Sequence, residues 1–353
     1  METGPDPKLR LVRSWLLAGC MLIGFMVVIG GITRLTGSGL SITEWKPIMG
    51  ALPPMSDVEW IEAFKKYQAI PEYRLLNSHM GLQDFKRIYF WEWLHRNWGR
   101  LMGLVFLVPF MVFWRKGLLK DWLMRRLLWV MLGGAIVGSL GWFMVQSGLT
   151  DQRDANGQLL VSVSHYRLAI HLGAALIVFA LVWWTWLDLR SGRRRSRGDG
   201  SAAGSAARGL LVLLFLQIIW GALTAGLDAG RSYNTWPLMN GVVMPENVTA
   251  FDSMWQNFTG HQDGVQFVHR WFAWVVAAAF VWLAVRHRGH ACIGAMRAWL
   301  IGGVLLQFAL GVVTILTRVH IVPGVAHQFG ALVLLAILLV AIHGTGAKAG
   351  ASS

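Results

Sequence analysis

The sequence predicts an all-α polytopic membrane protein. Its eight transmembrane helices are expected to form two tandem four-helix bundles related by a pseudo-two-fold axis along the membrane normal. Composition is the first reason, because the 353 residues are 55% hydrophobic and only 14% charged, well below the charged share of soluble domains. The second is a series of eight long apolar segments. The third is an internal repeat that relates the first four segments to the last four.

The apolar segments are typical of membrane-spanning helices, since about 18 to 20 such residues cross the hydrocarbon core. Several begin or end in one of the 20 tryptophans, which is typical of the aromatic belts at membrane interfaces. The segments lie near residues 15–33, 92–114, 127–146, 168–189, 210–227, 267–285, 298–317 and 325–343.

Basic residues predict the orientation. The net charge of +14 does not indicate a nucleic-acid partner, because more than half of the 32 Lys and Arg residues lie in short segments on one side of the membrane. The positive-inside rule places that side, with both termini, in the cytoplasm. The first residues lack the Arg- and Ser-rich character of an organelle transit peptide. We therefore expect a bacterial cytoplasmic (inner) membrane, with lipid around the chain.

The first outer segment, about residues 34–87, contains a predicted amphipathic helix. Ser56 and Glu59 form a capping-box pattern, and apolar residues follow at helical spacing. We expect this helix to lie on the outer surface, packed over the helix ends; a lid over a site is the alternative. The apolar residues are Trp60, Ile61, Phe64 and Tyr67.

A basic stretch rich in small residues, RSGRRRSRGDGSAAGSAARG, divides the eight segments into four and four. It predicts an amino-terminal half at 1–190, a cytoplasmic linker at 191–209 and a carboxy-terminal half at 210–353. Because each half has an even number of spans, both enter the membrane in the same orientation, as in a parallel repeat.

Three pairs of motifs support this duplication, because they occur in the same order in both halves. The outer loop TRLTGSGLSITEWKPIMGALPP corresponds to TAGLDAGRSYNTWPLMNGVVMP. The stretch LQDFKRIYFWEWLHR corresponds to HQDGVQFVHR, and HLGAAL corresponds to HQFGAL.

The repeat separates four histidines from the other seven. His95, His171, His269 and His327 open the even-numbered spans, at similar depth near the outer face. A single histidine near a helix end is usually only hydrogen-bonded, but four in repeat-related positions indicate ligands. Outer His79, His165, His261 and His320, and inner His287 and His290, are expected to be structural, although the first three are close enough to a site to stay candidates.

Two imidazoles from two helices restrict the kinds of site. Zinc usually has four ligands, or three and a water, and the non-haem iron triad needs a carboxylate. Di-iron sites need more acidic residues than these spans carry. Two histidines across an apolar slot suit the axial positions of a haem, which the small residues Gly99, Gly103, Gly173 and Gly330 would let lie between helices.

We therefore expect one haem in each half, held by His95 with His171 and by His269 with His327. Arginines next to these ligands are candidates for contacts with haem propionates; anchoring of the helix ends to lipid phosphates is an equal alternative. These arginines are Arg96, Arg100 and Arg270.

One position distinguishes the halves. Glu92 stands three residues before His95, whereas Gln266 stands three residues before His269. One helical turn places both on the face of the ligand. An ionisable group in the first half alone favours chemistry there and electron storage in the second. Drift at a tolerant position is the alternative.

Over nearly its whole length the sequence resembles the haem A synthase family of bacterial and mitochondrial membranes. The resemblance rests on GGITRLTGSGLSITEWKPIMGALPP, EWLHR, HLGAAL, VHR and VAHQ. The family oxidises a methyl group of haem O to the formyl group of haem A, the cofactor of terminal cytochrome oxidases. This sequence has only two cysteines, Cys20 and Cys292, and so resembles the branch of the family that lacks cysteine pairs in the outer loops.

The resemblance implies a role for each candidate residue. A resident haem b, the expected cofactor, would be held by His269 and His327 and would relay electrons. The substrate haem would lie between His95 and His171, and the important glutamate of the family falls on Glu92. The implied enzyme is an oxidoreductase acting on CH or CH2 groups. A haem O synthase and an electron-transfer partner are the implied partners, and a homo-oligomer stays open.

Two other classes of function remain. A di-haem cytochrome b would only transfer electrons and would keep both haems unmodified. A haem carrier without redox chemistry is compatible with parallel repeats, but the spans lack an obvious aqueous path of polar residues.

Overall fold

The computed structural model describes residues 6–46, 49–151, 161–192 and 200–346. This part of the chain is almost entirely helical. Eight of its helices are long and apolar enough to cross a membrane, which confirms the predicted class of a multi-pass membrane protein. The eight are α1 (Arg10–Leu35), α3 (Leu82–Arg115), α4 (Asp121–Leu149), α5 (His165–Ser191), α6 (Ala202–Gly226), α7 (Gln262–Arg286), α8 (Ala291–Leu316) and α9 (Ile321–Thr345).

Shorter elements occupy the loops. The amphipathic helix α2 (Asp57–Gln68) lies between α1 and α3, and single helical turns make up much of the rest. These turns are Pro7–Leu9, Met49–Ala51, Tyr73–Asn77, Ala229–Arg231, Glu246–Thr249 and Gln256–Gly260.

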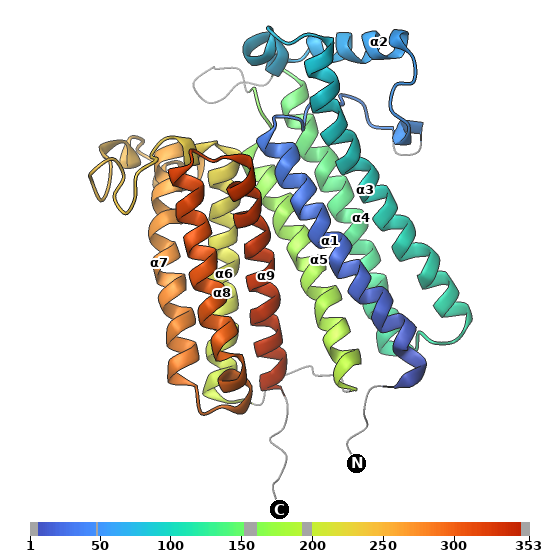
Figure 1. The fold of residues 1–353 in the computed structure, drawn as a ribbon, viewed down its shortest axis with the longest axis vertical. Coiled ribbons are helices and arrows are strands. Elements are labelled where there is room, and N and C mark those ends of the chain that lie inside the picture. The colour runs from blue at the N-terminus through green and yellow to red at the C-terminus, as the bar shows by residue number, and fades with distance from the viewer. Residues whose placement is uncertain (1–5, 47–48, 152–160, 193–199, 347–353) are drawn as a thin grey trace, which may run out of the picture.

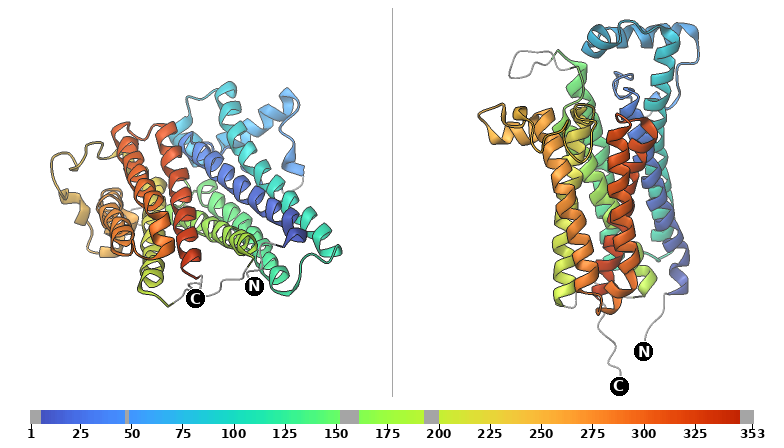
Figure 2. Two further views of the ribbon diagram at one scale, coloured as in Figure 1. Left: turned by 60° about the horizontal axis from the view of Figure 1, so that its bottom comes forward. Right: turned by 60° about the vertical axis from the view of Figure 1, so that its left-hand side comes forward.

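The membrane helices form two groups of four. In the first group α1 and α4 each contact both α3 and α5; in the second, α6 and α8 each contact both α7 and α9. The left-hand view of Figure 2, in which the lower end of the molecule is turned forward, shows the two groups side by side. The two groups contact each other through α1 and α5 of the first group and α6 and α9 of the second. Each group is thus a closed four-helix bundle, in which α3 stands opposite α5 and α7 stands opposite α9.

Helix α3 is longer than its predicted span, because it begins at Leu82 and not near residue 92. Its 34 residues extend about 51 Å at 1.5 Å per residue, well beyond a hydrocarbon core of about 30 Å. The additional turns carry Asp84, Lys86 and Arg87 and rise above the bundle, where α2 lies across them (Figure 1).

Helix α2 is confirmed with its capping box. Ser56 accepts a hydrogen bond from the Glu59 amide, and the Glu59 carboxylate accepts one from the Ser56 amide. Its aromatic residues pack on the α3 extension, with Trp60 edge-on to Tyr89 at 5.0 Å between ring centres. The exception is Ile61, which is exposed. The interpretation that this helix packs over helix ends fits the structure.

Residues 193–199 of the predicted linker lie outside the described part of the chain, and its last eight residues are helical. Helix α5 ends at Ser191 and α6 begins at Ala202, so residues 202–209 of the predicted linker are helical. Ser201 caps this start by accepting a hydrogen bond from the Gly204 amide at 3.0 Å, and the alanines that follow have the highest helix propensity. The small residues at 202–209 were therefore wrongly interpreted as part of a loop.

Candidate functional site

The four candidate histidines lie inside the two bundles, on opposite helices. His95 is on α3 and His171 on α5, while His269 is on α7 and His327 on α9. All four are partly buried. His95 and His171 face into the first bundle from its opposite helices α3 and α5, each against a glycine of a neighbouring helix. The ring centres of His269 and His327 are 6.2 Å apart with the planes at 79°. The structure thus brings together the predicted pairs.

A glycine on the neighbouring helix faces each imidazole. A Cβ atom added to Gly221 of α6 would lie 2.9 Å from the His269 ring, and one added to Gly311 of α8 would lie 2.9 Å from the His327 ring. The amino-terminal bundle repeats this arrangement. Here a Cβ atom added to Gly30 of α1 would lie 3.3 Å from the His95 ring, and one added to Gly141 of α4 would lie 3.1 Å from the His171 ring.

Main-chain carbonyl groups set the imidazole tautomer. Nδ1 of His171 lies 3.1 Å from the carbonyl oxygen of Val137, and Nδ1 of His327 lies 3.2 Å from that of Gln307. An Nδ1–H that donates to a carbonyl group leaves Nε2 with a free lone pair, as a metal ligand requires.

The donor set fits a haem. A metal–imidazole bond is about 2 Å. Two imidazoles on one metal ion therefore have ring centres roughly 6 Å apart, as His269 and His327 have. Among the described residues, no group of three or more His, Cys, Asp or Glu side chains is placed to hold a metal ion. The remaining ligands of such an ion must come from the bound group itself, as a macrocycle supplies them.

Glu92 is buried in the amino-terminal half, with 3% of its surface exposed. Its Oε1 atom is 2.5 Å from Nε of Arg96, one turn further along α3. Its counterpart Gln266 is also buried but neutral, and donates to the carbonyl oxygen of Tyr233 at 2.9 Å. The asymmetry seen in the sequence therefore corresponds to a buried ion pair in one half and a buried amide in the other.

An arginine follows His95 and His269 in the sequence, and in each half this arginine holds an outer loop. Arg96 donates to the carbonyl oxygens of Ile42 and Glu44, at 2.7 and 2.8 Å. Arg270 donates to those of Tyr233 and Thr235, both at 3.0 Å. The loop residues are the ones that the sequence repeat pairs.

A second correspondence lies on α1 and α6. Thr33 donates to the Trp91 carbonyl oxygen at 3.2 Å, and Thr224 to that of Val265 at 3.3 Å. These contacts support the repeat at the site itself, while the symmetry of the complete halves stays a prediction.

Propionate binding by the arginines also stays a prediction. Arg96, Arg100 and Arg270 direct their donors at main-chain carbonyl groups of the outer loops, with Arg100 bonded to Lys46 at 2.9 Å. Nε of Arg270 is buried and has no partner in the described part of the chain. It is the donor that a bound group could use.

The predicted glycine slot differs from the structure in part. Gly173 packs on Ile219 and Phe215 of α6, so it serves contact between the halves and not a macrocycle slot. The glycines that face the imidazoles were missed in the sequence. Each glycine ends one of the segments MVVIG, VGSLG, QIIWG and QFALG. In the last three, the residue four positions before the glycine contacts the same histidine.

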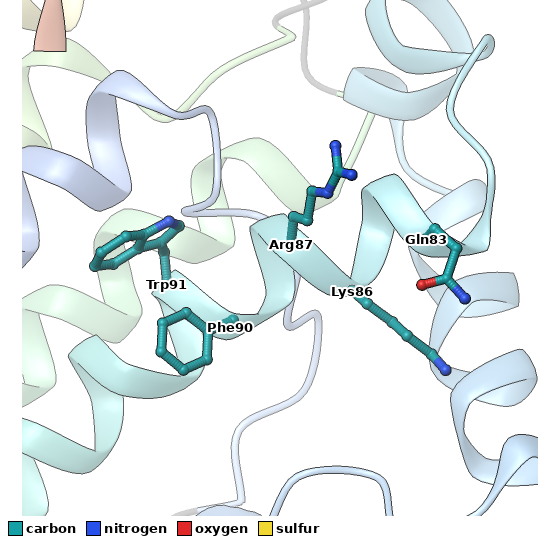
Figure 3. A pocket seen from close by; sticks show the side chains of 5 residues that line it. All are labelled: Gln83, Lys86, Arg87, Phe90 and Trp91. Carbon is teal, nitrogen blue, oxygen red and sulfur yellow. The ribbon is translucent and has the colours of Figure 1, made fainter.

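Other residues lie near the outer end without joining the site. His165 Nε2 and His261 Nδ1 are buried and lack hydrogen-bond partners among the described residues. A surface hollow of 350 Å³ lies on the first turns of α3 and contains none of the four histidines (Figure 3). It is lined by Gln83, Lys86, Arg87, Phe90 and Trp91.

Comparison with known proteins identifies the family of the chain. A sequence model described as cytochrome oxidase assembly protein matches residues 13–339. A heme A synthase of Rhodospirillum centenum is 44% identical over 95% of this chain and 88% of its own length.

The chain belongs to the haem A synthase family of cytochrome oxidase assembly proteins.

Further members of this family are equally similar. The heme A synthase of Parvibaculum lavamentivorans is 44% identical over 96% of this chain and 95% of its own length. That of Maricaulis maris is 44% identical over 97% and 98%. The resemblance inferred from the motifs is confirmed.

Proposed function

We propose that this chain oxidises a methyl group of haem O to a formyl group and so makes haem A for cytochrome oxidase. Family membership supports this reaction. The observation that carries it is the buried carboxyl group of Glu92 beside His95, where the other half has Gln266. A protein that only transfers electrons needs no such difference.

In this proposal one half binds the substrate and the other half binds the cofactor. The amino-terminal half, residues 1–190, binds the substrate haem O between His95 and His171. The carboxy-terminal half, residues 210–353, holds a haem b through His269 and His327. When bound, that haem b supplies one-electron transfer to an acceptor on the outer side.

Glu92 acts on the methyl group of the substrate. As a carboxylate it accepts a proton, or stabilises positive charge that develops on the methyl-derived carbon. Arg96 holds it at 2.5 Å from the guanidinium Nε, which fixes the position of the carboxyl group. Burial excludes bulk water, so this electrostatic stabilisation is stronger than it would be in water.

The enzyme is a CH- or CH2-oxidising oxidoreductase of the bacterial inner membrane, with both termini in the cytoplasm. The ends of consecutive spans alternate, so the start of α1 and the end of α9 lie at one end of the molecule (Figure 1). The basic segments that join α3 to α4 and α7 to α8 lie at that end too. Haem O synthase as supplier, an electron-transfer partner and a homo-oligomer complete the proposal.

The test is the substitution Glu92→Gln. The variant should retain its bound haem but lose conversion to haem A, measured by acid extraction and mass identification of every haem. Glu72→Gln is the matched control, because it removes another buried carboxyl group that lies in the outer segment. Normal haem A formation by Glu92→Gln would disprove the role given to Glu92.

A di-haem cytochrome b is the second candidate, favoured by the glycine that faces each of the four imidazoles. The same pigment analysis of the wild-type protein separates the two. Haem b with haem O or haem A indicates a cofactor and a substrate. Two equivalents of haem b alone, in cells that supply haem O, would indicate an electron carrier.

A further inference from the structure

Two glutamines contact the histidines of the carboxy-terminal half. Gln217 lies one turn before Gly221 on α6, and its Nε2 donates to the His269 carbonyl oxygen at 2.9 Å and lies 3.1 Å from the ring Nδ1. On α8, Gln307 lies one turn before Gly311. Its Nε2 donates to the His327 carbonyl oxygen at 2.9 Å and lies 3.2 Å from Nδ1.

The amino-terminal half has apolar residues at the matching positions. Met26 precedes Gly30 and Val137 precedes Gly141 by the same four residues. Met26 packs near His95, since its Cε atom is 3.5 Å from a Cβ built on Gly99, one turn beyond that histidine. Neither side chain can donate a hydrogen bond. In the described part of the chain, no side chain hydrogen-bonds to His95 or His171.

In both glutamine side chains the amide N–H group is hydrogen-bonded and the amide oxygen is not. Oε1 of Gln217 and of Gln307 are buried and find no hydrogen-bond partner within the described residues. Leaving a buried acceptor unpaired is unfavourable, so two such amides at matching positions indicate a role for the N–H groups that do have partners. Those partners are the main-chain carbonyl oxygens of His269 and His327, and the same amide nitrogens pack against the edge of each ring.

We propose that Gln217 and Gln307 are positioning residues that fix the orientation of His269 and His327 and so retain the cofactor haem. Met26 and Val137 place no side-chain amide on the main chain of His95 and His171, although the Val137 carbonyl oxygen still lies 3.1 Å from Nδ1 of His171. This lighter hold on the two histidines lets the substrate enter and leave. This assignment rests on the proposed function. Side chains that orient a ligand imidazole typically change metal affinity 10- to 100-fold when replaced.

The experiment gives each glutamine site the side chain of Met26, which has nearly the same volume. Gln217→Met and Gln307→Met are purified with their pigment, and haem b loss to excess apomyoglobin is timed. The low-temperature electron paramagnetic resonance spectrum reports the imidazole orientation. We expect haem loss about 10- to 100-fold faster than in the wild type, together with a shifted largest g value.

The control is Gln328→Met on α9. Gln328 also spans two helices, by donating to the Val27 carbonyl oxygen at 3.1 Å. Its replacement removes an amide of the same kind without touching an imidazole, so haem loss and spectrum should match the wild type. The reverse change, Met26→Gln, should slow the release of haem O and does not depend on folding of the two glutamine variants.

Haem loss from Gln217→Met and Gln307→Met at the rate of Gln328→Met would overturn the inference, and so would faster loss with an unchanged spectrum. Either result leaves the proposed function intact if wild-type protein contains haem b and converts haem O. A wild-type protein without haem b would instead refute the proposed function.

Discussion

Each candidate ligand depends on a neighbouring residue that has no side chain. The imidazoles of His269 and His327 sit where a Cβ on Gly221 or Gly311 would be 2.9 Å away, a distance that real Cβ contacts hardly ever show. A glycine inside a helix costs about 1 kcal/mol relative to alanine. Glycine at positions 221 and 311 therefore lowers helix stability but leaves space for the imidazole of the candidate ligand.

Replacement of Gly311 by alanine tests this arrangement. The added methyl group would push the His327 ring out of line, so we expect the variant to contain much less haem per protein than the wild type. Gly302→Ala on the same helix is the control, because no atom lies within 4 Å of its added Cβ. A pyridine haemochrome assay measures both, and equal haem content in the two variants would contradict the prediction.

At the scale of elements, α2 and the extended start of α3 form a small outer layer with its own core. Tyr67 of α2 is fully buried and stacks on Phe85 of α3 at 5.3 Å between ring centres. Its hydroxyl group donates to the Glu72 carboxyl group at 2.8 Å and accepts from Asn77 Nδ2 at 2.7 Å. A carboxyl group thus lies inside an aromatic cluster.

This layer is expected to open as the pH rises. Burial raises the pKa of Glu72 from 4.5 to about 7. The folded layer therefore holds a proton that the unfolded segment releases. Its contribution to stability is complete below about pH 4.5 and is lost as the pH rises through about 7. Hydrogen–deuterium exchange of residues 57–77, corrected for intrinsic rates, should show faster opening at pH 8 than at pH 5.5.

The substitution Glu72→Gln is the control for this pH effect. The amide keeps the shape of the carboxyl group but does not titrate, so the difference between the two pH values should disappear. If the variant keeps the full difference, another group causes it.

At the scale of the whole molecule, two aspartates, Asp228 and Asp188, make contacts between the halves at opposite ends. At the outer end, Arg34 of α1 pairs with Asp228 at 3.1 Å, and both are partly exposed. At the other end, Asp188 of α5 is buried and lies 2.5 Å from Arg126 of α4 and 3.0 Å from His343 of α9. Sequence reasoning missed this group, although an aspartate within a predicted span is itself a signal.

Replacing Asp188 by alanine should destabilise the assembly of the two halves. The change removes a buried carboxylate from Arg126 and His343, and breaking a buried pair typically costs about 3–5 kcal/mol. Asp228→Ala removes the partly exposed pair and should cost about 1 kcal/mol or less. Thermal unfolding in detergent compares them, and equal midpoints would mean that Asp188 does not hold the halves together.

The sequence by itself determined the parts of this protein that depend on local pattern. Eight apolar segments were enough for eight spans, because a bilayer requires about 20 apolar residues of any helix that crosses it. The Ser56–Glu59 capping box specified the start of α2, since its bonds connect neighbouring residues. The repeat identified the four histidines and set Glu92 apart from Gln266, because residues one turn apart share a helix face.

Only the tertiary structure decided which faces meet. Gly221, Gln217 and Gln307 became part of the site because α6 and α8 turn those residues towards α7 and α9. Asp188 met His343 because α5 packs on α9. Helical periodicity tells which residues share a face, but the partner of that face depends on packing between helices far apart in the chain. The candidate ligands could therefore be predicted from the sequence, and the residues that contact them from neighbouring helices could not.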